Sequence, residues 1–152
     1  MTKQAAVTGH TNGMGQKIYQ VLDQKGYKVQ GFSLSTGCDV RDYTQVGNMI
    51  EQIKTFDLFV NCAKPDFAQT QILYRLVGSR FKGTILNIGS PVAKNPPDWK
   101  ELGLLEYITQ KVALEYAHDQ LSKKFSTKMI MWHPAHATNT EYVQKCIEEF
   151  KL

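Results

Sequence analysis

Cysteine is scarce in this chain, and its three copies form no pattern. Cys38, Cys62 and Cys146 are odd in number and widely spaced. This spacing argues against the disulfide framework of a small secreted protein and against a CxxC metal site. A reducing compartment suits such cysteines, and we expect a cytoplasmic protein without a metal ion.

Long apolar runs and blocks of basic residues are also missing. No apolar run approaches the ~18 residues of a membrane span. The first predicted strand begins close to the N-terminus, which leaves no room for a signal peptide. The net charge is only +4, and the lysines are scattered. We therefore expect neither a membrane nor a nucleic acid as a partner.

What the sequence does contain is an alternation of strand and helix patterns within 152 residues, which is most simply one domain. Strands are predicted over 4–8, 28–32, 57–63, 84–88 and 128–132, and helices over 13–25, 43–55, 67–81, 102–124 and 141–151. Thr44 is a candidate cap for the second of these helices. Strands separated by helices indicate a parallel sheet with helices on both faces. Such sheets bind ligands at the carboxyl ends of their strands.

The first strand runs directly into a glycine turn. Gly9, Gly13 and Gly15 are spaced Gly-x3-Gly-x-Gly and are followed by an amphipathic helix pattern. Strand, glycine turn and helix together present backbone N–H groups to a phosphate. A plain tight turn is the alternative, because a lone glycine cluster is weak support for nucleotide binding.

Three polar residues further along suggest proton transfer. Tyr107 and Lys111 are four residues apart on a predicted helix and share a face. A nearby ammonium favours the phenolate and lowers the pKa of a tyrosine, which can then exchange a proton with a carbonyl or an alcohol. Ser90, at the end of a strand, is placed to hydrogen-bond the same oxygen. Taken alone, each of these residues is more simply a packing or surface residue.

Together these residues resemble the short-chain dehydrogenase/reductase family. The family's nucleotide loop, Thr-Gly-x3-Gly-x-Gly, is matched by Thr8, Gly9, Gly13 and Gly15. Its later segments are matched, in family order, by Asp39-Val40, Asn61-Cys62-Ala63-Lys64, Ser90, Tyr107-x3-Lys111 and Pro134-Ala135, with Thr138 or Thr140 near the family's threonine. The matches extend over nearly the whole chain.

The resemblance implies a Rossmann-type doubly wound parallel α/β sheet of about six strands, forming a single NAD(P)-binding domain over residues 1–152. It implies Ser90, Tyr107 and Lys111 as catalytic residues, with Tyr107 as acid/base and Ser90 orienting the carbonyl. The cofactor-binding residues that we expect are Gly9, Thr11, Asn12, Gly13, Met14, Gly15, Ser33, Ser35, Asp39, Val40, Asn61, Ala63, Lys111, Pro134 and Thr138.

The chain also departs from the family pattern. Only six residues separate Phe32 from Asp39. This connection is too short for the family's second helix and the strand after it, so we expect that helix and most of that strand to be missing. We also expect the C-terminal lid over the substrate to be missing. The family's fourth catalytic residue, an asparagine, has no match. Gln69 and Gln71 are chemically similar, and neither is preferred.

Cofactor choice depends on the end of the second strand. Residues 30–37 contain no acid to hold the ribose hydroxyl of NAD. Ser33, Ser35 and Thr36 offer hydroxyls for a 2′-phosphate, and Arg41 and His10 are the nearest cationic candidates. We therefore favour NADP(H) over NAD(H). The prediction reverses if Asp39 reaches the ribose.

Four other residues lie near the predicted site, and three of them keep two interpretations. His133 and His136 are packing or surface residues, or they contact substrate or phosphate. Lys64 replaces a family glycine and brings positive charge near the cofactor. Trp99 borders the substrate or fixes its own loop.

The function that we expect is NADP(H)-dependent hydride transfer with a small carbonyl or alcohol substrate. A non-catalytic NAD(P)-binding module, acting as a redox sensor or a subunit of an assembly, is the alternative. A sugar-nucleotide epimerase or dehydratase is a third reading. We expect a homodimer or homotetramer formed through the long helices.

Overall fold

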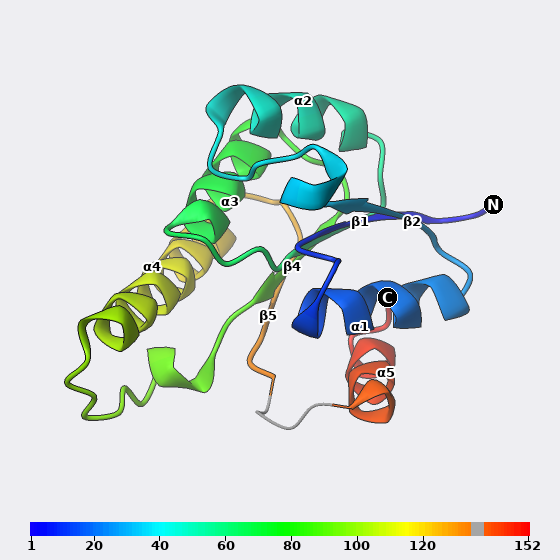
Figure 1. Ribbon diagram of the computed structural model, residues 1–152. Coiled ribbons are helices and arrows are strands. Elements are labelled where there is room, and N and C mark those ends of the chain that lie inside the picture. Colours follow the sequence, from blue (N-terminus) through cyan, green and yellow to red (C-terminus); the bar gives the residue numbers. More distant parts are fainter. Residues whose placement is uncertain (135–138) are drawn as a thin grey trace.

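The chain folds around a five-stranded parallel sheet. The computed structural model describes residues 1–134 and 139–152. Its strands are β1 (Gln4–Thr8), β2 (Lys28–Phe32), β3 (Leu58–Asn61), β4 (Thr84–Ile88) and β5 (Met129–Trp132). They lie in the order β2-β1-β3-β4-β5, and every neighbouring pair is parallel (Figure 1).

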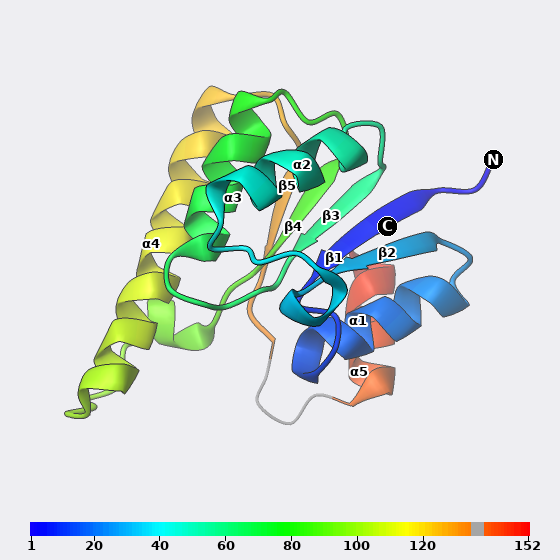
Figure 2. The same cartoon turned by 45° about the horizontal axis from the view of Figure 1, so that its top comes forward.

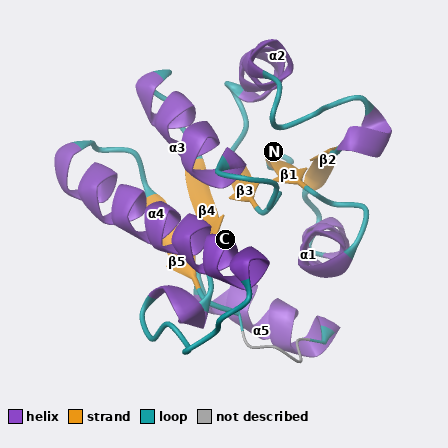
Figure 3. Cartoon of the chain, turned by 60° about the vertical axis from the view of Figure 1, so that its left-hand side comes forward, coloured by secondary structure: helices purple, strands orange, loops and turns teal. Residues whose placement is uncertain are grey.

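Helices cover both faces of this sheet. They are α1 (Gly13–Gln24), α2 (Tyr43–Ile53), α3 (Ala68–Gly78), α4 (Leu102–Lys124) and α5 (Thr140–Glu149), with short 3-10 helices η1 (Leu34–Thr36) and η2 (Pro91–Ala93). Figures 2 and 3 show α2, α3 and α4 on one side of the sheet and α1 and α5 on the other. This is the doubly wound α/β fold predicted from the sequence.

Side chains that point alternately to the two faces of the central strands form the two layers of the core. In β3, Phe59 packs with the buried residues of α2, α3 and α4, whereas Leu58 and Val60 pack with those of α1 and α5. All three are at most 1% exposed. Successive strand side chains point to opposite faces, so one apolar strand supplies both layers.

The sheet has five strands in the described residues, which are the five that the strand patterns predicted; the family resemblance had implied about six. The stretch after β2 forms η1 instead of a second helix and a further strand. The hydroxyl-rich sequence favours this short turn: Ser33 and Thr36 cap it reciprocally, and Gly37 ends it with a φ of 88°. The predicted loss of the family's second helix and of most of the strand after it is therefore confirmed.

Helix boundaries agree with the prediction to within three residues, but one cap differs. Asp42, and not Thr44, caps α2, because its carboxylate accepts a hydrogen bond from the backbone N–H of Gln45. Asp42 is the last extended residue before the helix, which is where a capping side chain can reach back to the first turn.

The strand order fixes where a ligand can bind. From β1 the chain continues to β2 on one side, and β3 lies on the other. Open parallel sheets form a crevice at the carboxyl ends of two strands whose connections diverge in this way. Here that crevice lies beyond Thr8 and Asn61.

Candidate active site

The turn after β1 requires glycine at two positions for different reasons. Gly9 has a φ of +68°, and a Cβ on it would lie 3.2 Å from the Cα of Ala63. A Cβ on Gly15 would lie 2.1 Å from the carbonyl oxygen of Gly9. Because this oxygen belongs to the backbone, only glycine lets α1 begin so close to the turn.

The N-terminus of α1 is open to a ligand. Asn12 is its N-cap but makes no side-chain capping bond, and the first turn contains no acidic residue. The first N–H groups of a helix need partners from outside it. A phosphate supplies such partners and gains from the positive end of the helix.

A cavity of about 400 Å³ lies in front of this turn. Ten of the predicted cofactor residues line it: Gly9, Thr11, Asn12, Gly13, Met14, Gly15, Ser33, Asp39, Val40 and Ala63. Further lining residues include Arg41, Cys62 and Lys64. Ser35 is not among them; its hydroxyl lies 3.0 Å from that of Ser33 within the η1 turn.

A second cavity, of about 280 Å³, contains the predicted catalytic residues. Ser90, Tyr107, Lys111 and Pro134 line it, together with Lys17. It shares Gly13, Met14 and Lys64 with the first cavity. The two cavities therefore adjoin across the glycine turn and form one elongated site. Thr138, like His136, lies outside the described residues.

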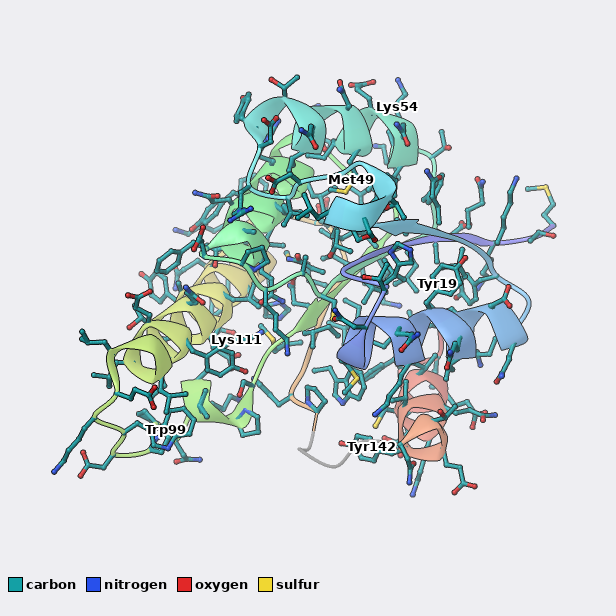
Figure 4. The ribbon with its side chains drawn as sticks, viewed as in Figure 1. Tyr19, Met49, Lys54, Trp99, Lys111 and Tyr142 are labelled. Atoms are coloured by element: carbon teal, nitrogen blue, oxygen red, sulfur yellow. The ribbon has the colours of Figure 1, made fainter. Side chains whose placement is uncertain are left out.

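The side chain of Lys111 is buried behind Tyr107. It is 3% exposed, and its Nζ lies 5.8 Å from the centre of the Tyr107 ring. Figure 4 shows Lys111 on the side of α4 that faces the sheet. The pKa of Lys111 is lowered from 10.5 to about 8, mainly by burial; Cys62 opposes this shift, and the Lys64 ammonium adds to it. A positive charge is thus held near the phenol at neutral pH.

Ser90 lines the second cavity and lies two residues after the end of β4. It is the N-cap of η2, and its Oγ accepts a long hydrogen bond of 3.4 Å from Val92 N–H. The hydroxyl hydrogen of Ser90 is not used in this bond. It remains a donor for a ligand oxygen in the cavity.

A buried polar network joins the strand ends beneath the site. Lys111 Nζ donates to Gln69 Oε1 at 2.8 Å and to the Ile88 carbonyl at 3.0 Å. Asn61 Nδ2 donates to the Gln69 carbonyl and to Asn87 Oδ1, and Asn87 Nδ2 contacts His118 Nδ1 at 3.0 Å. Asn61 is fully buried and lines neither cavity.

Sequence reasoning left Gln69 and Gln71 equal, and the structure separates them. Gln69 is 7% exposed and contacts Lys111, whereas Gln71 is exposed and lines a different cavity, between α2 and α3. The two residues are on α3 at positions two apart, which point to different sides of a helix. The apolar residues around Gln69 already marked its side of α3 as the buried one.

The segment between β2 and α2 carries hydroxyls and two opposite charges. The Oγ of Ser33 lies 3.2 Å from Thr36 Oγ1. Asp39 Oδ1 accepts from both the backbone N–H and the Nε of Arg41, at 3.0 and 3.2 Å. These two hydrogen bonds lower the pKa of the Asp39 carboxyl, with the backbone bond contributing most. The first cavity therefore contains a carboxylate and its arginine partner.

The remaining candidates lie around the site without lining either cavity. The ring of His10 occupies the space above Gly31 and packs near Tyr19, with centroids 5.4 Å apart. His133 contacts Glu115 at 2.8 Å. Trp99 is on the loop before α4 (Figure 4).

None of the helices in 1–134 and 139–152 combines the length and apolar character of a membrane span. The same residues contain no group of three or more histidine, cysteine, aspartate or glutamate side chains that could hold a metal ion.

No family model and no curated protein sequence matches this chain. Its structure nevertheless resembles solved structures. A short-chain dehydrogenase/reductase from Burkholderia vietnamiensis is 18% identical and superposes with a TM-score of 0.70, covering 97% of this chain and 91% of that one. A small-chain dehydrogenase solved with NADPH is 16% identical and superposes with a TM-score of 0.74, covering 99% of this chain and 81% of that one.

A third structure was solved with a different cofactor. It is the 3-alpha-hydroxysteroid dehydrogenase of Pseudomonas sp. B-0831 with NADH, at 15% identity and a TM-score of 0.73, covering 96% of this chain and 87% of that one. At such identities the likeness concerns the fold. This chain therefore has the fold of the short-chain dehydrogenases/reductases.

Proposed function

We propose that this chain binds NADP(H) in the elongated site and transfers hydride between the nicotinamide and a small carbonyl or alcohol substrate. The observation that carries the proposal is the junction of the two cavities at Gly13, Met14 and Lys64. It joins a phosphate-binding turn to a site lined by Ser90, Tyr107 and Lys111. Structural neighbours solved with NADPH and with NADH support the same class of cofactor.

The residues present fit such a cofactor. The close approach of Gly9 and Gly15 and the uncapped start of α1 suit a diphosphate. Lys64 lines both cavities where that diphosphate would lie, so its ammonium adds to the attraction. When bound, the nicotinamide supplies or accepts the hydride.

The chain's own residues would handle the proton. The Lys111 ammonium lies 5.8 Å from the centre of the Tyr107 ring, where its charge would stabilise the negative charge that develops on the phenol oxygen during proton transfer. Tyr107 then donates its phenolic proton to the carbonyl oxygen during reduction, and it accepts that proton during oxidation. Ser90 Oγ–H donates a hydrogen bond to the same oxygen and orients it.

A matched pair of tyrosines tests the catalytic assignment. We expect Tyr107→Phe to lower kcat by about 10²- to 10⁴-fold, the usual contribution of a general acid/base, with little change in the Kd of NADPH. Tyr116→Phe removes the same hydroxyl from the same helix, but at a 64% exposed position. We expect it to keep wild-type activity. Equal activity in both variants across a broad panel of carbonyl substrates would contradict the proposal.

Cofactor preference is tested by fluorescence titration with NADPH and NADH. We expect tighter binding of NADPH, because Arg41 and Ser33 both line the first cavity and offer a positive charge and a hydroxyl to a 2′-phosphate. Arg41→Met removes a charge-assisted hydrogen bond, so we expect NADPH binding to weaken about 10- to 100-fold and NADH binding to change little. Tighter binding of NADH by the wild type would reverse the cofactor assignment.

A cofactor-binding module without catalysis is the second candidate. The observation that favours it is the role of Ser90 as the cap of η2, which accounts for a serine here without chemistry. In that case NADPH binds and no substrate turns over, and the two tyrosine variants behave alike.

A further inference from the structure

Gln69 is held in a single orientation by its surroundings. Its Nε2 donates to the Asn61 carbonyl at 2.7 Å and to the Ile88 carbonyl at 2.9 Å. Because both partners are acceptors, the amide nitrogen must face them. Its Oε1 must therefore face Lys111, whose Nζ lies 2.8 Å away.

The ammonium of Lys111 is held by neutral oxygens. Its hydrogen-bond partners are Gln69 Oε1 and the Ile88 carbonyl. The titratable groups that face it are the Cys62 thiol and the Lys64 ammonium, from the loop after β3, and the Tyr107 phenol, from α4. Gln69 is thus the side-chain acceptor that stabilises a buried charge among these groups.

The position of Gln69 is itself fixed from below. The Gln69 carbonyl accepts from Asn61 Nδ2, and Asn61 also donates to Asn87 Oδ1. Asn87 is thereby oriented with its Nδ2 toward His118 Nδ1 on α4. Asn61 and Asn87 are both fully buried. The network ties α3 to α4 through the ends of β3 and β4, so the lysine and its acceptor cannot move apart independently.

We propose that Gln69 is a positioning residue for hydride transfer, which holds the Lys111 ammonium behind Tyr107 in the place of the asparagine that this chain lacks. The inference rests on the proposed function. Gln69 acts through Lys111 and lines neither cavity. Its loss should therefore change the protonation of Lys111 before it changes any contact with a ligand.

The contact can be tested without any substrate. We would label the full-length chain with [13C]lysine, assign Lys111 with Lys111→Arg, and titrate its 13Cε resonance. In the wild type the pKa of Lys111 is about 8. Gln69→Met removes the acceptor at nearly constant volume. A hydrogen bond to a charged group accounts for roughly one to two pKa units, so we expect the pKa to fall by that amount.

Two other variants test the direction of the change in the Lys111 pKa and whether the change is specific to Gln69. Gln69→Glu keeps an oxygen toward Lys111 and adds negative charge, so we expect the pKa of Lys111 to rise above the wild-type value. Gln71→Met is the matched control on the exposed side of α3, and we expect it to leave the titration unchanged. If Gln69→Met does not fold, Gln69→Glu still tests the contact. An unchanged Lys111 pKa in both folded Gln69 variants would overturn the inference.

The pH profile of kcat/KM connects this contact to the chemistry. Deprotonation of Lys111 removes the positive charge beside the Tyr107 phenol, so activity should fall at alkaline pH. In Gln69→Met we expect the alkaline limb of the kcat/KM profile to move to lower pH, by as many pH units as the NMR titration shows for the pKa of Lys111. The Kd for NADPH should stay unchanged. A limb that stays in place while the Lys111 pKa moves would overturn the positioning role. If no variant transfers hydride, the proposed function fails, and a shifted Lys111 titration would still assign Gln69 as the residue that holds this lysine.

Discussion

At the residue scale, burial of Lys111 couples the site to stability. Its pKa is about 8 in the folded chain, against an ordinary value of 10.5. Between these values the unfolded chain binds more protons than the folded one, so this lysine makes stability rise with pH. Below pH 8 its charge opposes folding.

A comparison of Lys111→Met with the wild type isolates this effect, because methionine does not titrate. We expect the free energy of unfolding of the wild type, relative to the variant, to rise by about 2 kcal/mol from pH 7.5 to 9.5. Urea unfolding at both pH values measures it. A constant difference between the two proteins would mean that Lys111 is not destabilised by burial.

Single residues show where sequence reasoning succeeds and where it stops. Gly9 and Gly15 could be predicted from their spacing, because their requirement is local. The role of Gln69 depends on two carbonyls from β3 and β4 that meet it only in the fold. Asn61 was expected to line the cofactor, but the partners that hold its side chain come from α3 and β4.

At the scale of elements, the start of α1 depends on close packing against the turn. A Cβ at Gly15 would overlap the Gly9 carbonyl, which cannot rotate away. We expect Gly15→Ala to lower the free energy of unfolding by about 1–3 kcal/mol, as overpacking does, and to weaken NADPH binding. Chemical denaturation and cofactor titration of the same samples measure both effects.

Gly103 in α4 is the control for this substitution. A Cβ there meets nothing within 4 Å. Because alanine restricts the unfolded chain and favours the helix, we expect Gly103→Ala to stabilise by up to about 1 kcal/mol. Equal effects of the two substitutions would show that helix propensity, and not the approach of α1 to Gly9, controls the result.

Helices and strands were predictable where a glycine marks their boundary. Gly26 ends the first helix region and Gly83 precedes β4, and both boundaries lie close to those expected. The η1 helix was not predicted, because a three-residue turn capped by Ser33 and Thr36 has no periodicity. Short 3-10 helices depend on side-chain capping bonds that a hydrophobic pattern does not record.

At the scale of the whole molecule, the outer face of α3 and α4 remains partly apolar. Leu105, Val112 and Tyr116 follow helical spacing on α4 and are 40%, 41% and 64% exposed, and Tyr74 on α3 is 49% exposed. Residues spaced by seven and four share a helix face. The sequence prediction of a homo-oligomer formed through the long helices therefore applies to this face.

Light scattering coupled to size exclusion tests this prediction. We expect the wild type to be a dimer or a tetramer, and Val112→Lys with Tyr116→Lys to shift it toward a smaller species. The double substitution places two charges on the apolar face and leaves both cavities intact. A wild type that is monomeric at high concentration would contradict the prediction.

The whole fold was more predictable than the site, because the order of strand and helix patterns decides the class of sheet. The short connection after Phe32 already indicated that a helix and most of a strand of the family are absent, and the five strands found agree with the five predicted from their patterns. The predicted role of Thr138 in cofactor binding stays a prediction, because this residue lies outside the described residues.

The open sheet also has consequences for aggregation. Within the described residues β2 and β5 each pair with one neighbour, so each leaves a row of backbone groups free for pairing with another chain. On β2, Lys28 is charged and exposed and disfavours such pairing. The β5 strand is Met-Ile-Met-Trp and contains no charge. Of the two edges, β5 is therefore the one from which the protein would begin to aggregate when stressed.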